Sequence, residues 1–230
     1  MLLRDAPFRL CDINLGGLVG LLEAARIHNL ERIVWFSSIL AYGNRADLQP
    51  VPEDTPLLPT TAYGATKAAG EALVNAFYAE HGVDAISLRV ASCYGPGRTT
   101  DCLIRILIED GLAGRTTLVR DDPVFTRQHI FVGDVVAGVK GALFAPKLSQ
   151  RAYNVAPGRA QSLKEIVAAV RSVVPAVDVA IDPGGMAWNT FGLGSLMVDA
   201  ARRDLGFNPT TTLADGAAHT LSWVKERATA

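Results

Sequence analysis

The chain has 230 residues, of which 49% are hydrophobic and 20% charged, and this composition predicts a soluble globular protein of one or two domains. Its formal net charge of -1 argues against partners such as nucleic acid or an anionic membrane surface, and no apolar run approaches the ~20 residues of a membrane span. The three cysteines are widely spaced, and neither Cys-x-x-Cys nor His-x-x-His occurs, so we expect no metal site and a reducing, cytoplasmic location.

The first hundred residues alternate predicted helices and strands. A helix near 10–28 precedes a short apolar strand near 32–37, a proline-rich loop, a helix at about 62–81 that Thr60 or Thr61 can cap, and a strand at about 84–90. This alternation predicts a parallel sheet with crossover helices. Ligands bind at the carboxyl ends of the strands in such sheets.

The second half is less regular. The pattern predicts helices at about 101–111, 133–145, 163–173 (with Ser162 as its cap) and 213–228, short extended pieces around 116–131, and a strand at 151–155.

Tyr63 and Lys67 are four residues apart and share one face of their predicted helix. A free tyrosine has a pKa near ~10, and we expect the ammonium to stabilise the phenolate and lower that pKa. Ser38, at the end of the preceding strand, could hold a substrate oxygen beside it. This set can oxidise an alcohol or reduce a carbonyl. The alternative is an ordinary exposed helix pair, with serine hydroxyls that cap a strand.

Several further motifs occur in a fixed order along the chain. They are Asn14-Leu-Gly-Gly17 with Leu21-Leu-Glu-Ala-Ala25, Phe36-Ser-Ser38 with Tyr42-Gly43, Leu88-Arg89 with Tyr94-Gly-Pro-Gly97, Arg127-Gln-His-Ile-Phe-Val-Gly-Asp134, and Asp199 through Pro209. With Tyr63-Gly-Ala-Thr-Lys67, this set resembles the extended short-chain dehydrogenase/reductase family, in its NAD-dependent epimerase/dehydratase branch.

The resemblance implies an α/β fold, a truncated Rossmann-like parallel sheet with crossover helices plus a small C-terminal substrate-binding region. Residues 1–97 would be the C-terminal part of the NAD(P)-binding domain. Residues 98–230 would be a mixed region, with substrate-binding segments and returning Rossmann elements. The implied function is an NAD(P)-dependent oxidoreductase, epimerase or dehydratase that acts on a sugar or sugar-derived hydroxyl.

The resemblance also implies site residues. The catalytic residues would be Ser38, Tyr63 and Lys67; the cofactor would meet Asn14, Ser37, Tyr63, Lys67 and Ala91; the substrate would meet Ser38, Ser92, Arg98, Thr126 and Arg127. Ser92 stands where the family has an asparagine that contacts the diphosphate of nucleotide sugars, and this departure favours a smaller sugar, a sugar acid or a hydroxy acid. Arg127 would bind a phosphate or carboxylate, and its alternative is an ion pair.

The family's glycine-rich dinucleotide loop is not found ahead of Asn14, and Gly16-Gly17-Leu-Val-Gly20 lies inside a predicted helix instead. We expect NAD, with NADP left open, because the discriminating residue belongs to that loop region. We also expect Ile33-Val-Trp-Phe36 to form an uncovered sheet edge, which favours low stability or a homodimer. A catalytically silent binding or oligomerisation module without dinucleotide binding is the alternative function.

Overall fold

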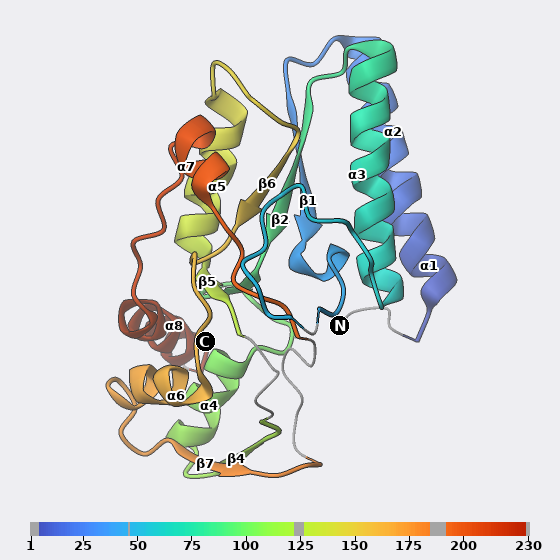
Figure 1. The fold of residues 1–230 in the computed structure, drawn as a ribbon. Coiled ribbons are helices and arrows are strands. Elements are labelled where there is room, and N and C mark those ends of the chain that lie inside the picture. The colour runs from blue at the N-terminus through green and yellow to red at the C-terminus, as the bar shows by residue number, and fades with distance from the viewer. Residues whose placement is uncertain (1–4, 46, 122–126, 185–191, 229–230) are drawn as a thin grey trace.

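The centre of the molecule is a parallel sheet of three strands, β1 (Ile33–Ser38), β2 (Ala85–Val90) and β6 (Ala152–Val155), in the order β1-β2-β6. A computed structural model of the chain describes residues 5–45, 47–121, 127–184 and 192–228 (Figure 1). Ser38 pairs with Val90, and Val90 with Val155, so the carboxyl ends of the three strands meet at one edge. The predicted parallel α/β fold is confirmed.

One face of the sheet is covered by α1 (Pro7–Cys11), the π-helical turn η1 (Asp12–Gly16), α2 (Gly17–His28) and α3 (Ala62–His81) (Figure 1). The first three run on without a break, so the helix predicted near 10–28 is present with a wider turn inside it. The side chain of Thr61 caps α3 by accepting from the backbone N–H of Gly64 at 3.0 Å.

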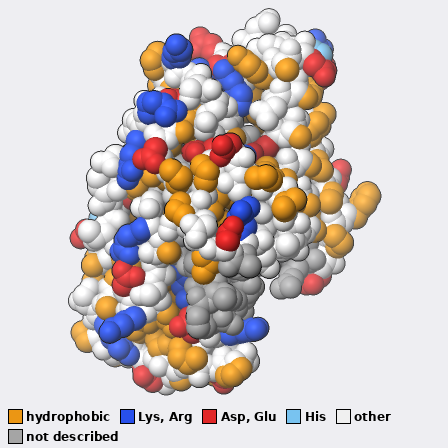
Figure 2. All heavy atoms as spheres, viewed as in Figure 1, with side chains coloured by type: hydrophobic (Ala, Val, Ile, Leu, Met, Phe, Trp, Pro, Cys, Tyr) orange, Lys and Arg blue, Asp and Glu red, His pale blue; other side chains and the backbone are white. Residues whose placement is uncertain are grey.

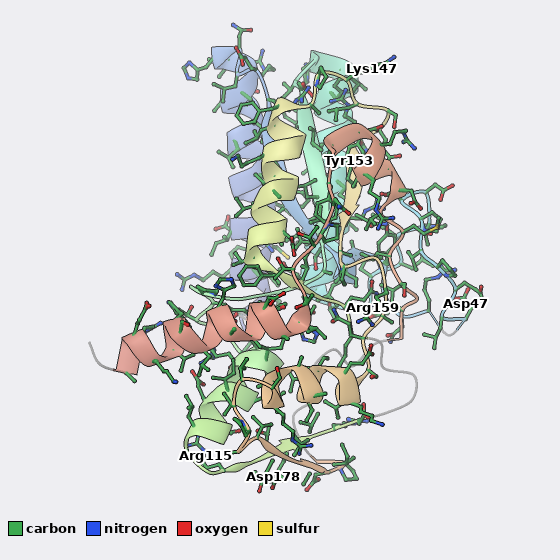
Figure 3. The ribbon with its side chains drawn as sticks, turned by 90° about the vertical axis from the view of Figure 1, so that its left-hand side faces the viewer. Asp47, Arg115, Lys147, Tyr153, Arg159 and Asp178 are labelled. Carbon is green, nitrogen blue, oxygen red and sulfur yellow. The ribbon has the colours of Figure 1, made fainter. Side chains whose placement is uncertain are left out.

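The other face is covered by α5 (Val132–Phe144) and α7 (Asp199–Leu205), so helices enclose the sheet from both sides. Figure 3 shows Tyr153 on β6 directed toward α7, where its hydroxyl donates to Asp204 at 2.8 Å. The largest apolar core lies between these elements and includes Ile86, Leu88 and Phe207.

A second group of elements lies beyond the carboxyl ends of the strands. It contains α4 (Leu103–Leu112), α6 (Leu163–Arg171), α8 (Leu213–Ala228) and a parallel pair, β4 (Thr116–Val119) with β7 (Asp178–Ile181). A second parallel pair, β3 (Ser92–Tyr94) with β5 (His129–Phe131), follows directly from the end of β2. The strand β7 and the helix α7 were not predicted from the sequence. The helices and strands that were predicted are present within a few residues of their expected bounds.

Among the described residues, β1 is an edge strand of the three-stranded sheet, as expected for Ile33-Val-Trp-Phe36. The edge is uncovered only in part, because Phe36 is 48% exposed, whereas Trp35 is buried and Ile33 and Val34 are half-buried. Large apolar side chains on α1, η1 and α2 are exposed as well, and Figure 2 shows hydrophobic side chains on the surface over α1. Among the described helices, none is both long and apolar enough to cross a bilayer. The described residues contain no group of three or more histidine, cysteine and acidic side chains that could hold a metal ion.

Candidate active site

The site begins where β1 ends. Ser38 is extended, and its hydroxyl oxygen caps the 3-10 turn η2 (Ile39–Ala41) by accepting from the backbone N–H of Leu40 at 3.2 Å. The start of α3 presses against this turn, because a Cβ on Gly64 would lie 2.3 Å from the carbonyl oxygen of Leu40. Only glycine permits this approach, which brings its neighbour Tyr63 to the end of β1.

The side chain of Ser38 lies near the phenol of Tyr63 and favours its ionised form. Burial raises the pKa of Tyr63, while the polar side chain of Ser38 and the positive charge of Arg98 act in the opposite direction. The expected lowering of this pKa by Lys67 is therefore absent from this structure. The geometry gives the reason: Nζ of Lys67 lies 5.5 Å from the centroid of the Tyr63 ring, over its face.

Lys67 is buried, and burial lowers its pKa. Its Nζ lies 4.6 Å from the centroid of the Trp35 ring on β1. Within the described part of the chain, no group hydrogen-bonds this ammonium, and its contacts are the two aromatic faces. Its three N–H donors are thus available to a bound molecule.

Asn14 lies in the π-helical turn and contacts the same helix. Its side-chain amide donates to the hydroxyl of Thr66 at 2.9 Å, and that hydroxyl donates to the carbonyl oxygen of Tyr63 at 2.8 Å. π-helical turns within α-helices are frequent at functional sites. Here the turn places Asn14 against the segment of α3 between Tyr63 and Lys67.

Ser37 and Ser38 have different surroundings although they are adjacent. The Ser37 hydroxyl donates to the carboxylate of Glu71 in the interior, in a short contact. Ser38 instead meets Tyr63. These surroundings agree with the prediction that Ser38 is the catalytic serine, and a cofactor contact of Ser37 stays a prediction.

Beneath the site lies a buried polar network that the sequence motifs do not reveal. The guanidinium of Arg89 on β2 donates to Glu71 on α3 from Nε at 3.0 Å and from Nη2 at 2.6 Å. Its Nη1 donates to the hydroxyl of Tyr42 at 2.7 Å, and that hydroxyl donates to Asn154 on β6 at 2.8 Å. The network ties α3 to the neighbouring ends of the strands. The sequence held one signal for this network: Arg89 lies inside a predicted buried strand, and a buried arginine needs a charged partner.

Three further candidates follow β2. Ala91 is buried, and its N–H donates to the carbonyl oxygen of Val155 at 3.0 Å. Ser92 is half-buried and pairs with His129 in the β3–β5 ladder. Arg98 donates to the carbonyl oxygens of Cys93 and Asp101, and its charge reaches Tyr63. The fold brings Arg98, Tyr63, Lys67 and Ser38 together.

Arg127 is 2% exposed, and its guanidinium donates to Asp121 at 2.8 Å and to the carbonyl oxygen of Arg120 at 3.3 Å. The ion pair that was the alternative for Arg127 is therefore present, and a substrate contact stays a prediction. Thr126 lies outside the described residues.

Comparison with known proteins agrees with this fold. The NAD dependent epimerase/dehydratase family matches residues 4–156. UDP-glucose 4-epimerase of Mycolicibacterium smegmatis is 31% identical over an aligned length of 229 residues, and the alignment covers 97% of this chain and 71% of the relative. dTDP-glucose 4,6-dehydratase of Streptomyces griseus is 32% identical over an aligned length of 215 residues, and the alignment covers 91% of this chain and 63% of the relative.

A crystal structure of UDP-glucose 4-epimerase from Thermotoga maritima with UDP-glucose has a TM-score of 0.88 to this chain. The alignment covers 99% of this chain and 74% of that one at 22% identity, so the likeness shows a shared fold. This chain is thus shorter than all three proteins. The family match and the two relatives show that the chain belongs to the NAD dependent epimerase/dehydratase family, an enzyme family whose cofactor is NAD.

Proposed function

We propose that the protein catalyses an NAD-dependent epimerase, dehydratase or oxidoreductase step at a hydroxyl of a sugar or sugar-derived substrate. The observation that carries the proposal is the position of Tyr63, which the close approach of Gly64 to Leu40 brings to the carboxyl end of β1, with Nζ of Lys67 5.5 Å from its ring centroid and with Ser38 and Arg98 acting on its pKa. Ligands of parallel α/β sheets bind at this edge.

In the proposed reaction, Tyr63 takes the proton of the reacting hydroxyl, and Ser38 holds the oxygen of that hydroxyl by a hydrogen bond. Because burial keeps the pKa of Tyr63 above its ordinary value in the structure, the phenol is protonated at neutral pH before substrate arrives. To serve as a base it needs more positive charge at its oxygen than Arg98 alone provides, and Lys67 is the nearby cation that can supply this.

The donor set around Lys67 suits NAD. An ammonium with no hydrogen-bonding partner among the described residues can donate to the two hydroxyls of a ribose. We propose that Asn14 and Ala91 also contact NAD at this edge of the sheet. When bound, NAD supplies the hydride acceptor. Lys67 orients the ribose, and its charge acts on Tyr63.

The substrate class is the finer part of the proposal. The relatives named above act on UDP-glucose and dTDP-glucose, whereas Ser92 stands in the slot of an asparagine. We propose a sugar-type substrate and leave the choice between nucleotide sugar and smaller sugar acid to competition experiments with UDP-glucose, dTDP-glucose and free glucuronate. A cytoplasmic location stays a prediction.

The test is calorimetric titration of the 230-residue chain with NAD and with NADP, followed by turnover assays with the three candidate substrates. Lys67→Met should weaken NAD binding, whereas Lys140→Met, an exposed lysine on α5, should not. Tyr63→Phe should abolish turnover and leave NAD binding measurable. Absence of binding at millimolar NAD and NADP would refute the enzyme proposal for this chain.

The second candidate is a catalytically silent module that associates through its apolar surface. It is favoured by exposed side chains such as Phe8 (87% exposed), Leu21 (56%) and Ile27 (57%), together with Phe36 on the edge strand. Light scattering after gel filtration would detect the homodimer that this surface favours. Leu21→Glu with Ile27→Glu should then give a monomer. A monodisperse wild-type monomer that melts cooperatively would exclude this candidate.

A further inference from the structure

Trp35 is the side chain on β1 that faces the ammonium of Lys67, and neither the sequence motifs nor the proposed proton transfer gives it a role. Its ring centroid is 4.6 Å from Nζ of Lys67, and the residue is 9% exposed. This separation lies within the ~6 Å range of a cation–π interaction, for which tryptophan is the strongest aromatic partner.

The position of the ring is fixed by α3. A Cβ on Gly70 would lie 2.2 Å from Cη2 of Trp35, so the indole edge rests directly on the backbone of the helix. Gly70 is three residues beyond Lys67 and therefore close to it on the helix surface. Any side chain at position 70 would push the indole ring from its place beside the ammonium.

We propose that Trp35 is a positioning residue, which holds the Lys67 ammonium in its charged form on the Tyr63 side of α3. The catalytic meaning of this position rests on the proposed function, whereas the contact itself is a property of the chain without cofactor. Burial disfavours the charged amine, and the negative face of the indole ring offsets part of this cost.

Titratable side chains on the same helix and on elements packed against it include Tyr63 and Glu71 on α3, Asp12 in the π-helical turn and Arg89 on β2. The lowered pKa of Lys67 has burial as its cause and no contribution from these groups. The Glu71 carboxylate is already bound by Arg89 and Ser37. Replacing Trp35 therefore removes the nearer of the two aromatic faces from Lys67 and changes no formal charge near it.

The experiment measures the pKa of Lys67 in the cofactor-free protein by NMR of selectively ¹³C-labelled lysine side chains. Lys67→Arg assigns the signal among the five lysines. Trp35→Leu should lower the pKa of Lys67 by about 0.4 to 1.5 units, the worth of a cation–π contact, and Trp35→Phe should lower it less. Trp223→Leu is the control, because Trp223 lies on α8 and stacks on Arg227 instead.

Gly70→Ala provides a second variant that keeps the indole and displaces it, and it should lower the pKa of Lys67 in the same direction. Circular dichroism establishes which variants fold. An unchanged Lys67 pKa in any folded variant among Trp35→Leu, Trp35→Phe and Gly70→Ala would overturn the inference. A shifted pKa in a chain that binds no NAD would support it while refuting the proposed function.

Discussion

The buried pair of Glu71 and Arg89 offers the sharpest test of how this site is held together. Arg89 is 5% exposed and Glu71 3% exposed, and they are joined by three hydrogen bonds of 2.6 to 3.0 Å. Replacing Glu71 by leucine leaves a buried guanidinium without its counter-charge.

Breaking a buried pair from one side costs about 3–5 kcal/mol. Since a domain of this size loses ~2–4 °C of Tm per kcal/mol, Glu71→Leu should lower Tm by roughly 6–20 °C. Removing both partners, as Glu71→Leu with Arg89→Met, should cost far less than the sum of the single changes, because neither buried charge then remains. The residual cost of the double variant is the lost hydrogen bonds to Ser37, Tyr42 and the carbonyl oxygen of Glu53, each worth about 0.5–1.5 kcal/mol.

Urea unfolding followed by circular dichroism measures the free energy of unfolding for the wild type, both single variants and the double variant. An exposed pair provides the control: Arg202 and Asp199 on α7 are 3.3 Å apart with side chains 50% and 65% exposed. Their single variants should lose no more than about 1 kcal/mol. If the losses for Glu71 and Arg89 add to within about 0.5 kcal/mol, the two residues are not coupled and the reasoning fails.

Three further predictions concern other parts of the chain. Burial raises the pKa of Tyr42 to about 12, so the folded state holds this proton at pH values where the unfolded state has lost it. The free energy of unfolding should therefore fall as the pH rises from about 10 to 12. Equal free energies of unfolding near pH ~9 and pH ~11 would contradict this. Asp121→Asn should destabilise the chain more than Arg127→Gln, because it leaves the buried guanidinium of Arg127 without a counter-charge. In Arg127→Gln the carboxylate of Asp121 loses its partner instead, but it is 38% exposed and water can solvate it. Chemical unfolding of the two variants compares their free energies of unfolding. Ser162→Ala removes the capping box of α6 and should cost about 0.5–2 kcal/mol in thermal melts, against a control at the exposed Ser222.

Local signals in the sequence predicted the central elements well. The strand predicted near 32–37 is a short apolar run and is present at 33–38, and the helix predicted at 62–81 is capped by Thr61 and Gly82. In contrast, β7 has four residues and pairs with a strand about 60 positions earlier, so neither its length nor its neighbours in sequence indicate it.

Long-range partners were harder to predict than elements. The carboxylate of Glu71 meets a guanidinium 18 residues away, and the ring of Trp35 meets Lys67 across the sheet–helix interface. The direction of the Tyr63 pKa shift was mispredicted for the same reason. Spacing shows that Lys67 is near, but it does not show how deeply the phenol is buried or that the ammonium lies over its ring face.

The proton-transfer residues and the buried ion pair are joined by the same helix, α3. Tyr63, Lys67 and Glu71 follow one another at four-residue intervals on α3, so the residue that anchors the helix to β1 and β2 lies one turn beyond the cation of the site. A shift of α3 caused by loss of the anchor would move Tyr63 relative to Ser38, which β1 holds. Changes at Glu71 should therefore impair catalysis by misplacing the tyrosine, whereas changes at Trp35 should act through the ionisation of Lys67. The pH–rate profile separates the two, because only the second moves its midpoint.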